Sequence, residues 1–301
     1  MKKTSYLYVI FAATLWGGIG VFFKILSGLG FSQMQVVAIR VTSAAIALTL
    51  YILIKDPSLL KIKLKDCWCF VGTGIISLVF FNWCYFTAIE LTSLAVAAVL
   101  MYTSPIFVML FSTILFKEKI NLQKIIALIM TFIGCIFVAN IFHSSANNFS
   151  AIGILVGIGS GIGYALYSIF GRYAIEKGYH SITISEYTFV FAMIGSLPIS
   201  GLIKSLPMLV NTQAVTSTLG IGVLCCVFPF ILYTKGLSNI ENSKAAIMAT
   251  IEPAVATLLS FFLYGEKLLN SKGIGIFLIF ISVLLLNLEP KDNKAIKIKY
   301  I

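Results

Sequence analysis

Long apolar stretches fill almost the whole chain, and short polar segments separate them. A helix that crosses a bilayer needs roughly 20 mainly apolar residues. The stretches that meet this requirement are 5–26, 33–54, 66–88, 93–116, 121–142, 150–175, 182–203, 213–236, 243–264 and 271–289. The connectors between them are short, the longest being 55–65, 143–149 and 204–212. The pattern therefore predicts an all-α integral membrane protein with ten transmembrane helices and no soluble catalytic domain.

The chain also repeats itself at an offset of 148 residues. Residues 85–140 placed over 233–288 give 13 identities in 56 positions. The matched pairs include Tyr85 with Tyr233, Pro105 with Pro253, Glu118 with Glu266, Trp16 with Tyr164, Phe22 with Phe170 and Lys24 with Arg172. Each half holds five spans, an odd number, so the halves must lie in the membrane with opposite orientations. Such inverted repeats are the architecture of secondary transporters, whose two halves rock around a central site.

The repeat sets the expected domain boundaries. We expect a first five-span repeat at 1–142, an outer linker at 143–149, a second, inverted five-span repeat at 150–289 and a basic cytoplasmic tail at 290–301. Composition agrees with a membrane protein, because the chain is 59% hydrophobic and only 11% charged, whereas soluble domains average about 25% charged residues. One apparently complete inverted pair within a single chain favours a monomer.

The net charge of +11 at first suggests a nucleic-acid partner, but its distribution argues against one. With the N-terminus in the cytoplasm, 17 of the 22 Lys and Arg residues fall on the inner side, and four fall on the outer side. The remaining one, Arg40, lies inside a span. This is the positive-inside pattern of a multi-pass protein of the cytoplasmic membrane, and it places both termini in the cytoplasm.

The residues that would support an enzyme or a metal site are scarce. The chain has two histidines, His143 and His180, and neither belongs to a His-Glu-x-x-His motif. Its six cysteines all fall in or at the edge of spans, and no second pair completes a tetrahedral site beside Cys67 and Cys69. We therefore expect no enzyme activity, no metal and no cofactor.

Charged side chains within spans are costly and usually face the protein interior or a water-filled cavity. Glu252 is the foremost candidate, because it lies near the middle of span nine and directly precedes Pro253. Proline removes a backbone donor and interrupts the helix, as Pro105 would in span four. Glu252 could thus bind and release a proton, or be a neutral structural group bonded to a neighbouring helix. Its repeat partner is Ser104, so the first half needs no carboxylate at that position.

Arg40 and Glu186 are the other charged candidates within spans. Arg40 lies roughly 10 Å inside span two, at a depth that differs from that of Glu252 by about 6 Å. It could pair with Glu252, hold a substrate carboxylate with two hydrogen bonds, or extend outward to the lipid headgroups. Glu186 is expected at the cytoplasmic interface, with lining of the pathway as the alternative.

Aromatic and amide residues near mid-span could form the walls of a cavity for a small organic solute. The candidates are Trp16, Asn82, Tyr102 and Tyr164, of which Trp16 and Tyr164 are repeat partners. Ordinary core packing is the alternative for each of them.

These residues resemble the EamA type of the drug/metabolite transporter superfamily. The features that carry the resemblance are Leu15-Trp16-Gly17-Gly18, Ala97-Ala98 with Pro105 and Glu118, and their repetition as Ala245-Ala246, Glu252-Pro253 and Gly265-Glu266-Lys267. The resemblance covers the whole chain. It implies a pathway formed by spans one to four and six to nine, with spans five and ten at the periphery. The first half departs from the family pattern, because Lys117 precedes Glu118 where a glycine is frequent.

The sequence and the resemblance together predict an alternating-access carrier for small metabolites, with export of amino acids across the cytoplasmic membrane as the favoured activity. The alternatives are a sugar-phosphate or nucleotide-sugar exchanger of the same superfamily and an exporter of drugs or toxic compounds. Proton coupling through Glu252 and simple facilitation both stay open. The expected partners are the solute, the bilayer and, if transport is coupled, protons, but not nucleic acid.

Overall fold

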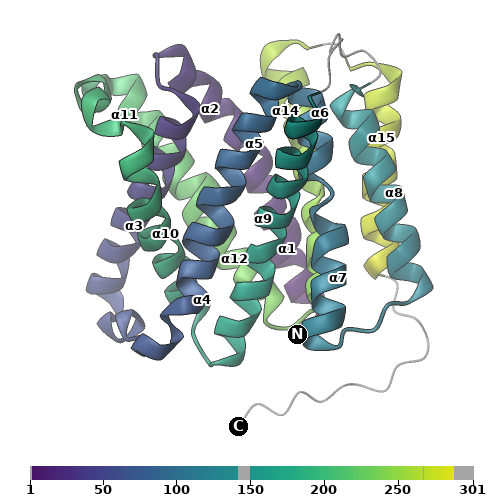
Figure 1. Ribbon diagram of the computed structural model, residues 1–301, viewed down its shortest axis with the longest axis horizontal. Helices are drawn as coiled ribbons and strands as arrows, with labels where there is room; N and C mark the ends of the chain where they lie inside the picture. Colours follow the sequence, from purple (N-terminus) through teal and green to yellow (C-terminus); the bar gives the residue numbers. More distant parts are fainter. Residues whose placement is uncertain (1, 142–149, 267, 288–301) are drawn as a thin grey trace.

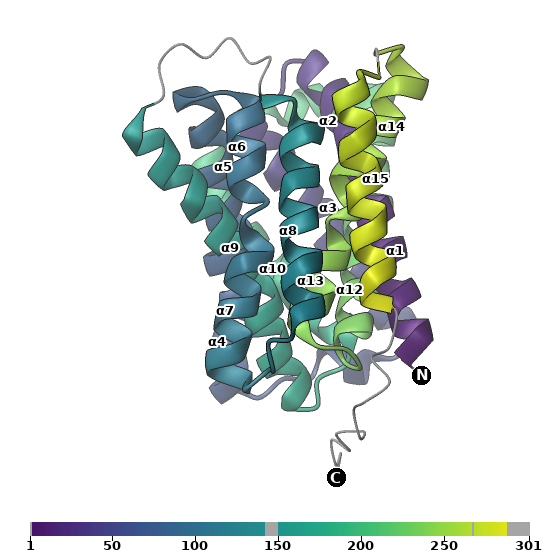
Figure 2. The same cartoon turned by 90° about the vertical axis from the view of Figure 1, so that its right-hand side faces the viewer.

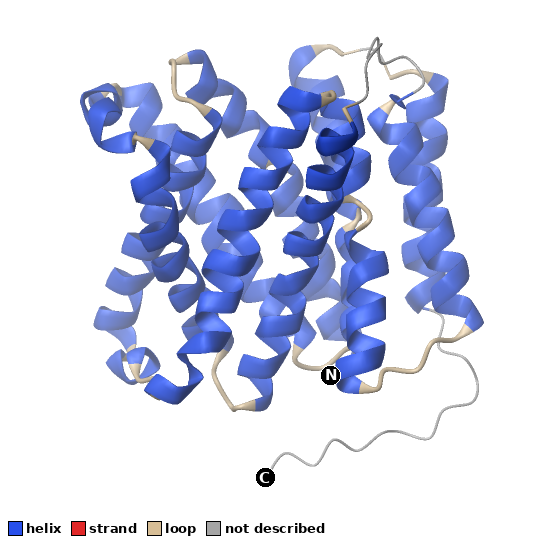
Figure 3. Ribbon diagram, in the orientation of Figure 1, coloured by secondary structure: helices blue, strands red, loops and turns tan. Residues whose placement is uncertain are grey.

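The computed structural model describes residues 2–141, 150–266 and 268–287. Every regular element in these ranges is a helix, as Figure 3 shows. Ten helical stretches are long and apolar enough to cross a membrane, and each ends within three residues of a predicted span. The prediction of an all-α membrane protein with ten transmembrane helices is thereby confirmed. The expected linker at 143–149 and the basic tail at 290–301 lie outside the described residues.

The first half contains the helices α1 (Lys2–Gly17), α2 (Ile19–Gly28), α3 (Gln33–Lys55), η1 (Pro57–Leu60), η2 (Leu64–Asp66), α4 (Cys67–Val71), η3 (Gly72–Val79), α5 (Phe80–Leu91), α6 (Leu94–Met101), α7 (Ser104–Phe116) and α8 (Leu122–Ala139). The second half contains α9 (Ala151–Glu176), α10 (Ser181–Ser200), η5 (Leu202–Val210), α11 (Thr212–Leu219), η6 (Gly220–Val227), α12 (Phe228–Leu237), α13 (Asn242–Ala249), α14 (Ile251–Tyr264) and α15 (Asn270–Asn287).

The helices form one bundle with two distinct ends. We call the end at which α1 begins and α15 ends the termini side, and the other end the opposite side (Figure 1). Helix α9, which starts the second half, begins at the opposite side, so it runs antiparallel to α1 (Figure 2). Helices α8 and α15 pack against each other at one edge of the bundle, where the hydroxyls of Thr131 and Ser282 are 2.6 Å apart.

The 148-residue repeat is visible in the helix geometry. Spans three and eight each contain a π-helical stretch, η3 and η6, whose limits coincide under the repeat. Each stretch begins with a glycine on which a phenylalanine of the other half packs. A Cβ added to Gly72 would lie 2.3 Å from the Phe170 ring, and one added to Gly220 would lie 2.3 Å from the Phe22 ring. The two halves therefore interlock through duplicated close contacts.

Three spans are interrupted near mid-membrane. Span one breaks at Gly18, between α1 and α2. Span four breaks between Met101 and Ser104, and span nine breaks at Thr250. In spans four and nine the break lies just before the proline of the repeat, where the missing N–H and the bulk of the ring disfavour a continuous helix. These interruptions place irregular backbone beside the centre of the bundle, which a membrane protein tolerates where the backbone is covered by protein or lines a cavity.

Candidate binding cavity

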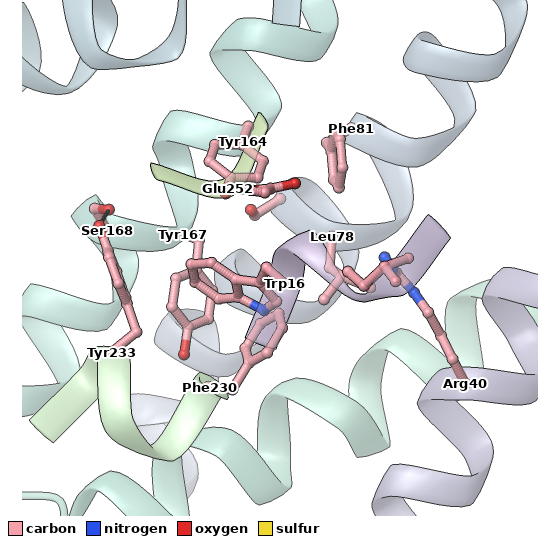
Figure 4. A pocket seen from close by; sticks show the side chains of 12 residues that line it. Trp16, Arg40, Leu78, Phe81, Tyr164, Tyr167, Ser168, Phe230, Tyr233 and Glu252 are labelled. Carbon is pink, nitrogen blue, oxygen red and sulfur yellow. Dashed lines mark hydrogen bonds between the residues drawn. The ribbon is translucent and has the colours of Figure 1, made fainter. Parts of the chain in front are cut away.

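A cavity lies at the centre of the bundle between the two halves. Its lining residues are Trp16, Ile19, Arg40, Ser77, Leu78, Phe81, Tyr164, Tyr167, Ser168, Phe230, Tyr233 and Glu252. Figure 4 shows these side chains converging from helices of both halves. The cavity measures about 70 Å³, whereas small-molecule sites typically span roughly 300–1,000 Å³. A solute of more than a few atoms would therefore require the lining to open.

Aromatic rings form one wall of the cavity. Trp16 comes from the end of α1, and its ring centroid lies 5.4 Å from that of Phe230 and 5.3 Å from that of Tyr233. The next residue, Gly17, lets α1 approach α14, because a Cβ there would lie 2.8 Å from the Val255 side chain. The glycine after the tryptophan thus brings the ring against the centre of the bundle.

Tyrosine hydroxyls form the floor of the cavity, at its end nearer to where α9 and α12 finish. Ser168 and Tyr233 hydroxyls are 2.7 Å apart, and so are those of Tyr167 and Thr234. Both pairs join α9 to α12. The Tyr167 and Phe230 rings pack with centroids 5.0 Å apart. This floor is well packed, and its hydroxyls are paired, as buried polar groups need to be.

Arg40 supplies the positive charge of the cavity. Its side chain leaves α3 and extends toward the part of the cavity where Glu252 lies (Figure 4). The residue is 9% exposed, so it does not extend to the headgroups. One terminal nitrogen donates to Asn82 Oδ1 at 3.3 Å, and Asn82 Nδ2 donates to the Leu78 carbonyl at 2.7 Å. The Arg40 Nε has no hydrogen-bond partner within the described part of the chain. The guanidinium therefore retains donors for a further acceptor.

Glu252 supplies the negative charge. It lies in the first turn of α14, directly after the break in span nine, where the helix dipole favours a carboxylate. Its Oε2 accepts a hydrogen bond of 3.0 Å from the Tyr164 hydroxyl. No ion pair joins Glu252 to Arg40 among the described residues, so both charged groups remain directed at the shared space. The cavity is thus lined by one guanidinium and one carboxyl group.

The structure brings together four of the six residues singled out as candidates: Trp16, Arg40, Tyr164 and Glu252 line the cavity. Asn82 is not part of the lining, and it stands behind Arg40 as its hydrogen-bond acceptor. Tyr102 also lies outside the lining and packs against the large core cluster beside the break in span four.

Two other charged residues, Glu186 and Lys24, lie outside the cavity. Glu186 is 1% exposed and accepts a hydrogen bond from Thr49, so its side chain is buried between α10 and α3 and does not line the cavity. Lys24 lies away from the cavity, 3.6 Å above the Tyr264 ring. Within the described part of the chain no cluster of His, Cys, Asp and Glu could hold a metal ion, and all six cysteines are free.

Sequence reasoning missed several lining residues, among them Tyr167, Ser168, Phe230 and Tyr233. Helical spacing could have identified two of them, because residues three and four after Tyr164 share its face of α9. Tyr233 carried a signal as well, since it is the repeat partner of Tyr85. Phe230 carried the same kind of signal, because it is the repeat partner of Asn82.

Comparison with known proteins identifies the relatives of this chain. The model of the EamA-like transporter family matches it twice, over residues 3–140 and 151–288. The uncharacterized transporter YwfM of Bacillus subtilis is 25% identical over 98% of each chain. A transporter of Clostridium kluyveri is 25% identical over 99% of this chain and 97% of its own. The uncharacterized inner membrane transporter YicL of Salmonella typhimurium is 23% identical over 96% of this chain. One solved crystal structure superposes with a TM-score of 0.78 over 96% of this chain and 98% of its own at 17% identity, a likeness that concerns the fold alone.

Proposed function

The chain belongs to the EamA-like transporter family, and from that premise we propose that this membrane transporter exports a small zwitterionic solute, an amino acid being the favoured class. The observation that carries the proposal is that Arg40 and Glu252 both line one cavity with aromatic walls. A zwitterion presents a carboxylate and an ammonium group within a few ångströms of each other, which matches one cationic and one anionic group in a shared space.

Recognition would use the groups already held in place around the cavity. Arg40 would bind the substrate carboxylate, because a guanidinium presents parallel donors that match the two oxygens. Asn82 would orient the guanidinium, because its Oδ1 accepts a hydrogen bond from one terminal nitrogen of Arg40. Glu252 would bind the ammonium group, and the Tyr164 hydroxyl would hold the Glu252 carboxylate in place. The rings of Trp16 and Phe230 would contact the apolar part of the substrate.

Transport would proceed by alternating access. The antiparallel course of α1 and α9 supports a frame of two inverted halves that can rock around the cavity. In this frame the aromatic floor, held by the Tyr167–Phe230 ring contact and the Ser168–Tyr233 hydroxyl pair, would be the barrier between the cavity and the termini side. The excess of Lys and Arg on that side supports placing it in the cytoplasm. The exporter would then load from the cytoplasm in a second conformation, in which the floor is parted.

Glu252 also supports coupling to protons. A proton arriving from outside would bind its carboxylate, weaken its attraction for the substrate ammonium group and favour release of the substrate. The return step would carry the proton inward and release it to the cytoplasm. This exchange of one proton for one zwitterion requires no group other than Glu252 and its donor Tyr164.

An exchanger of sugar phosphates or nucleotide sugars is less compatible with this cavity. A dianionic substrate generally needs several cations around it. Arg40 is the one cationic residue in the lining described above, and Lys24 lies elsewhere.

The test is transport of an amino-acid and metabolite panel by proteoliposomes, with and without a pH gradient. We expect saturable flux of amino acids that the gradient drives, and loss of the gradient effect in Glu252→Gln. Glu186→Gln serves as the matched control, because it also neutralises a buried glutamate but lies outside the cavity. Gradient-driven flux that survives Glu252→Gln unchanged would refute the coupling. Flux of phosphorylated sugars in preference to amino acids would refute the substrate class.

A further inference from the structure

A carboxylate of the first half is docked onto a helix of the second half at the termini side. Glu118 follows the end of α7, and its Oε1 accepts from the backbone N–H of Asn242 at 2.6 Å. Its Oε2 accepts from the Ser243 hydroxyl at 2.6 Å and from the Ser243 N–H at 3.2 Å. These donors form the first turn of α13, whose own N-cap residue, Glu241, makes no capping bond. Glu118 therefore caps a helix that belongs to the other half.

The neighbours of this contact strengthen it. Asn242 Nδ2 donates to Ser112 Oγ on α7 at 3.1 Å, which adds a fourth hydrogen bond between the halves at this contact. Arg172 of α9 donates to Asn242 Oδ1 at 2.8 Å and to the Ile240 carbonyl, which fixes the loop that leads into α13. Lys124 is buried beside the carboxylate, with its Nζ 3.9 Å from Glu118. The Glu118 side chain is accordingly only 9% exposed.

The repeat places an equivalent carboxylate, Glu266, at the opposite side. The backbone presents both glutamates in the same way. Lys117 and Gly265 both adopt left-handed conformations, with φ of 56° and 64°. The N–H groups of Glu118 and Glu266 both return to the carbonyl of a serine six residues earlier, Ser112 and Ser260. The two side chains therefore start from the same geometry.

Their surroundings differ nevertheless. The Glu266 side chain is 52% exposed, and its one ion pair among the described residues is with Lys272 at 3.9 Å. Its equivalent target would be the first turn of α6, formed by Leu94 and Ala95. Helix α13 packs against α7, whereas α6 and α14 have at most marginal contact. In Figure 2 the upper ends of α6 and α14 stand well apart. Glu118 thus joins the two halves at the termini side, whereas Glu266 makes no equivalent contact among the described residues at the opposite side.

We propose that Glu118 and Glu266 are the two arms of one reciprocal gate. Docking of Glu118 on α13 closes the termini side, and docking of Glu266 on the N–H groups of Leu94 and Ala95 closes the opposite side when the first contact breaks. The first-turn N–H groups of a helix have no partner within it, so α6 can receive a carboxylate. The proposal rests on alternating access in the proposed function, but it requires neither a particular substrate nor proton coupling.

The two arms are not equal. Leu94 occupies the repeat position of Asn242, so the opposite side lacks a side chain that could bond to Ser260 as Asn242 bonds to Ser112. The first turn of α6 also has its own cap, because Ser93 accepts from the Val96 N–H. The closed termini side is therefore held by more hydrogen bonds than a closed opposite side would be. The resting protein should favour the conformation described here.

Hydrogen–deuterium exchange of the full chain in lipid nanodiscs tests the gate without any transport measurement. The backbone amides of 240–249 report on α13, and those of 93–101 report on α6. In Glu118→Gln we expect exchange at 240–249 to rise by roughly tenfold, the order expected for loss of a charge-assisted hydrogen bond, and exchange at 93–101 to fall. Glu266→Gln is the matched control, which should leave 240–249 as protected as in the wild type or more so.

A second variant protects the test against a folding defect. Ser243→Ala removes one bond to Glu118 and leaves the carboxylate in place, so it should shift both segments in the same directions by a smaller factor. Faster exchange at 240–249 without slower exchange at 93–101 would overturn the reciprocal gate and leave Glu118 a local helix cap. Unchanged exchange at 240–249 in both variants would overturn the latch itself. Either result would leave the proposed transport activity standing.

Discussion

The duplicated contact between a phenylalanine and a glycine allows a quantitative test of how the halves interlock. In Gly72→Ala the added Cβ would lie 2.3–2.6 Å from three ring atoms of Phe170, far inside ordinary van der Waals contact. The ring or η3 must shift by about 1 Å, and overpacking of this kind costs about 1–3 kcal/mol. Gly171→Ala is the matched control. It lies in the adjacent position of α9, where the nearest atom is Leu237 Cδ2 at 3.9 Å.

We expect the two alanine variants to change the free energy of unfolding in opposite directions. Gly171→Ala should stabilise by up to about 1 kcal/mol, because alanine favours a helix interior over glycine. Gly72→Ala should lower the free energy of unfolding, and Phe170→Leu in the same chain should recover part of the loss. Thermal unfolding in detergent, followed by intrinsic fluorescence, provides the comparison. Equal melting temperatures for the two alanine variants would refute the reasoning, as would a loss in Gly72→Ala that Phe170→Leu does not reduce.

Three further predictions concern single side chains. Lys117→Gly should raise thermal stability by about 1 kcal/mol, because a left-handed conformation costs a residue with a Cβ about that much; a melting curve checks it, with Gly265→Ala expected to show the opposite shift. Arg40→Lys should raise the KM for the transported zwitterion roughly tenfold with a smaller effect on maximal rate, since a point charge replaces the paired donors; an equal KM would contradict the assignment. The pKa of Lys177 is raised chiefly by its hydrogen bond to Asp66. The stabilisation from this pair is therefore present at neutral pH and lost as pH rises through that raised pKa. Lys177→Met should melt earlier than the wild type at pH 7, and the gap should close at strongly alkaline pH, where Lys177 is neutral, and at acid pH, where Asp66 is protonated.

The fold was readable from the sequence because its signals are long. A run of about 20 apolar residues can hardly be anything but a span, and ten such runs with an internal match at one fixed offset fix the number of helices and their pairing. The breaks near Pro105 and Pro253 were also accessible, since proline acts locally. The π-helical stretches were not. They depend on close packing between η3 and α9 and between η6 and α2, and nothing local marks them except the glycines at which they begin.

The site was only partly readable, for a different reason. Charges in spans are rare, so Arg40 and Glu252 stood out from the sequence. Which way a side chain faces is a property of packing, however. Glu186 is buried against Thr49 and does not line the cavity, and Tyr102, a candidate for the cavity, packs into the core. Glu186 lies on α10, which carries polar side chains on more than one face, and Tyr102 lies in the break between α6 and α7, so helical periodicity could not assign the direction of either side chain.

The two charged groups of the cavity occupy positions where the repeat is broken. Arg40 corresponds to Thr188 in the second half, and Glu252 corresponds to Ser104 in the first. The features that shape the frame are instead kept in both halves: the phenylalanines on Gly72 and Gly220, the prolines after the breaks in spans four and nine, and the glutamates that follow the left-handed Lys117 and Gly265. A rocking mechanism needs two near-equivalent halves, since each half should adopt the conformation of the other when access switches sides. Oriented binding of a zwitterion needs the reverse, because two equivalent charges could not distinguish its ends. In this chain the repeat keeps the residues that shape the frame, as rocking requires, and differs at Arg40 and Glu252, as oriented binding requires.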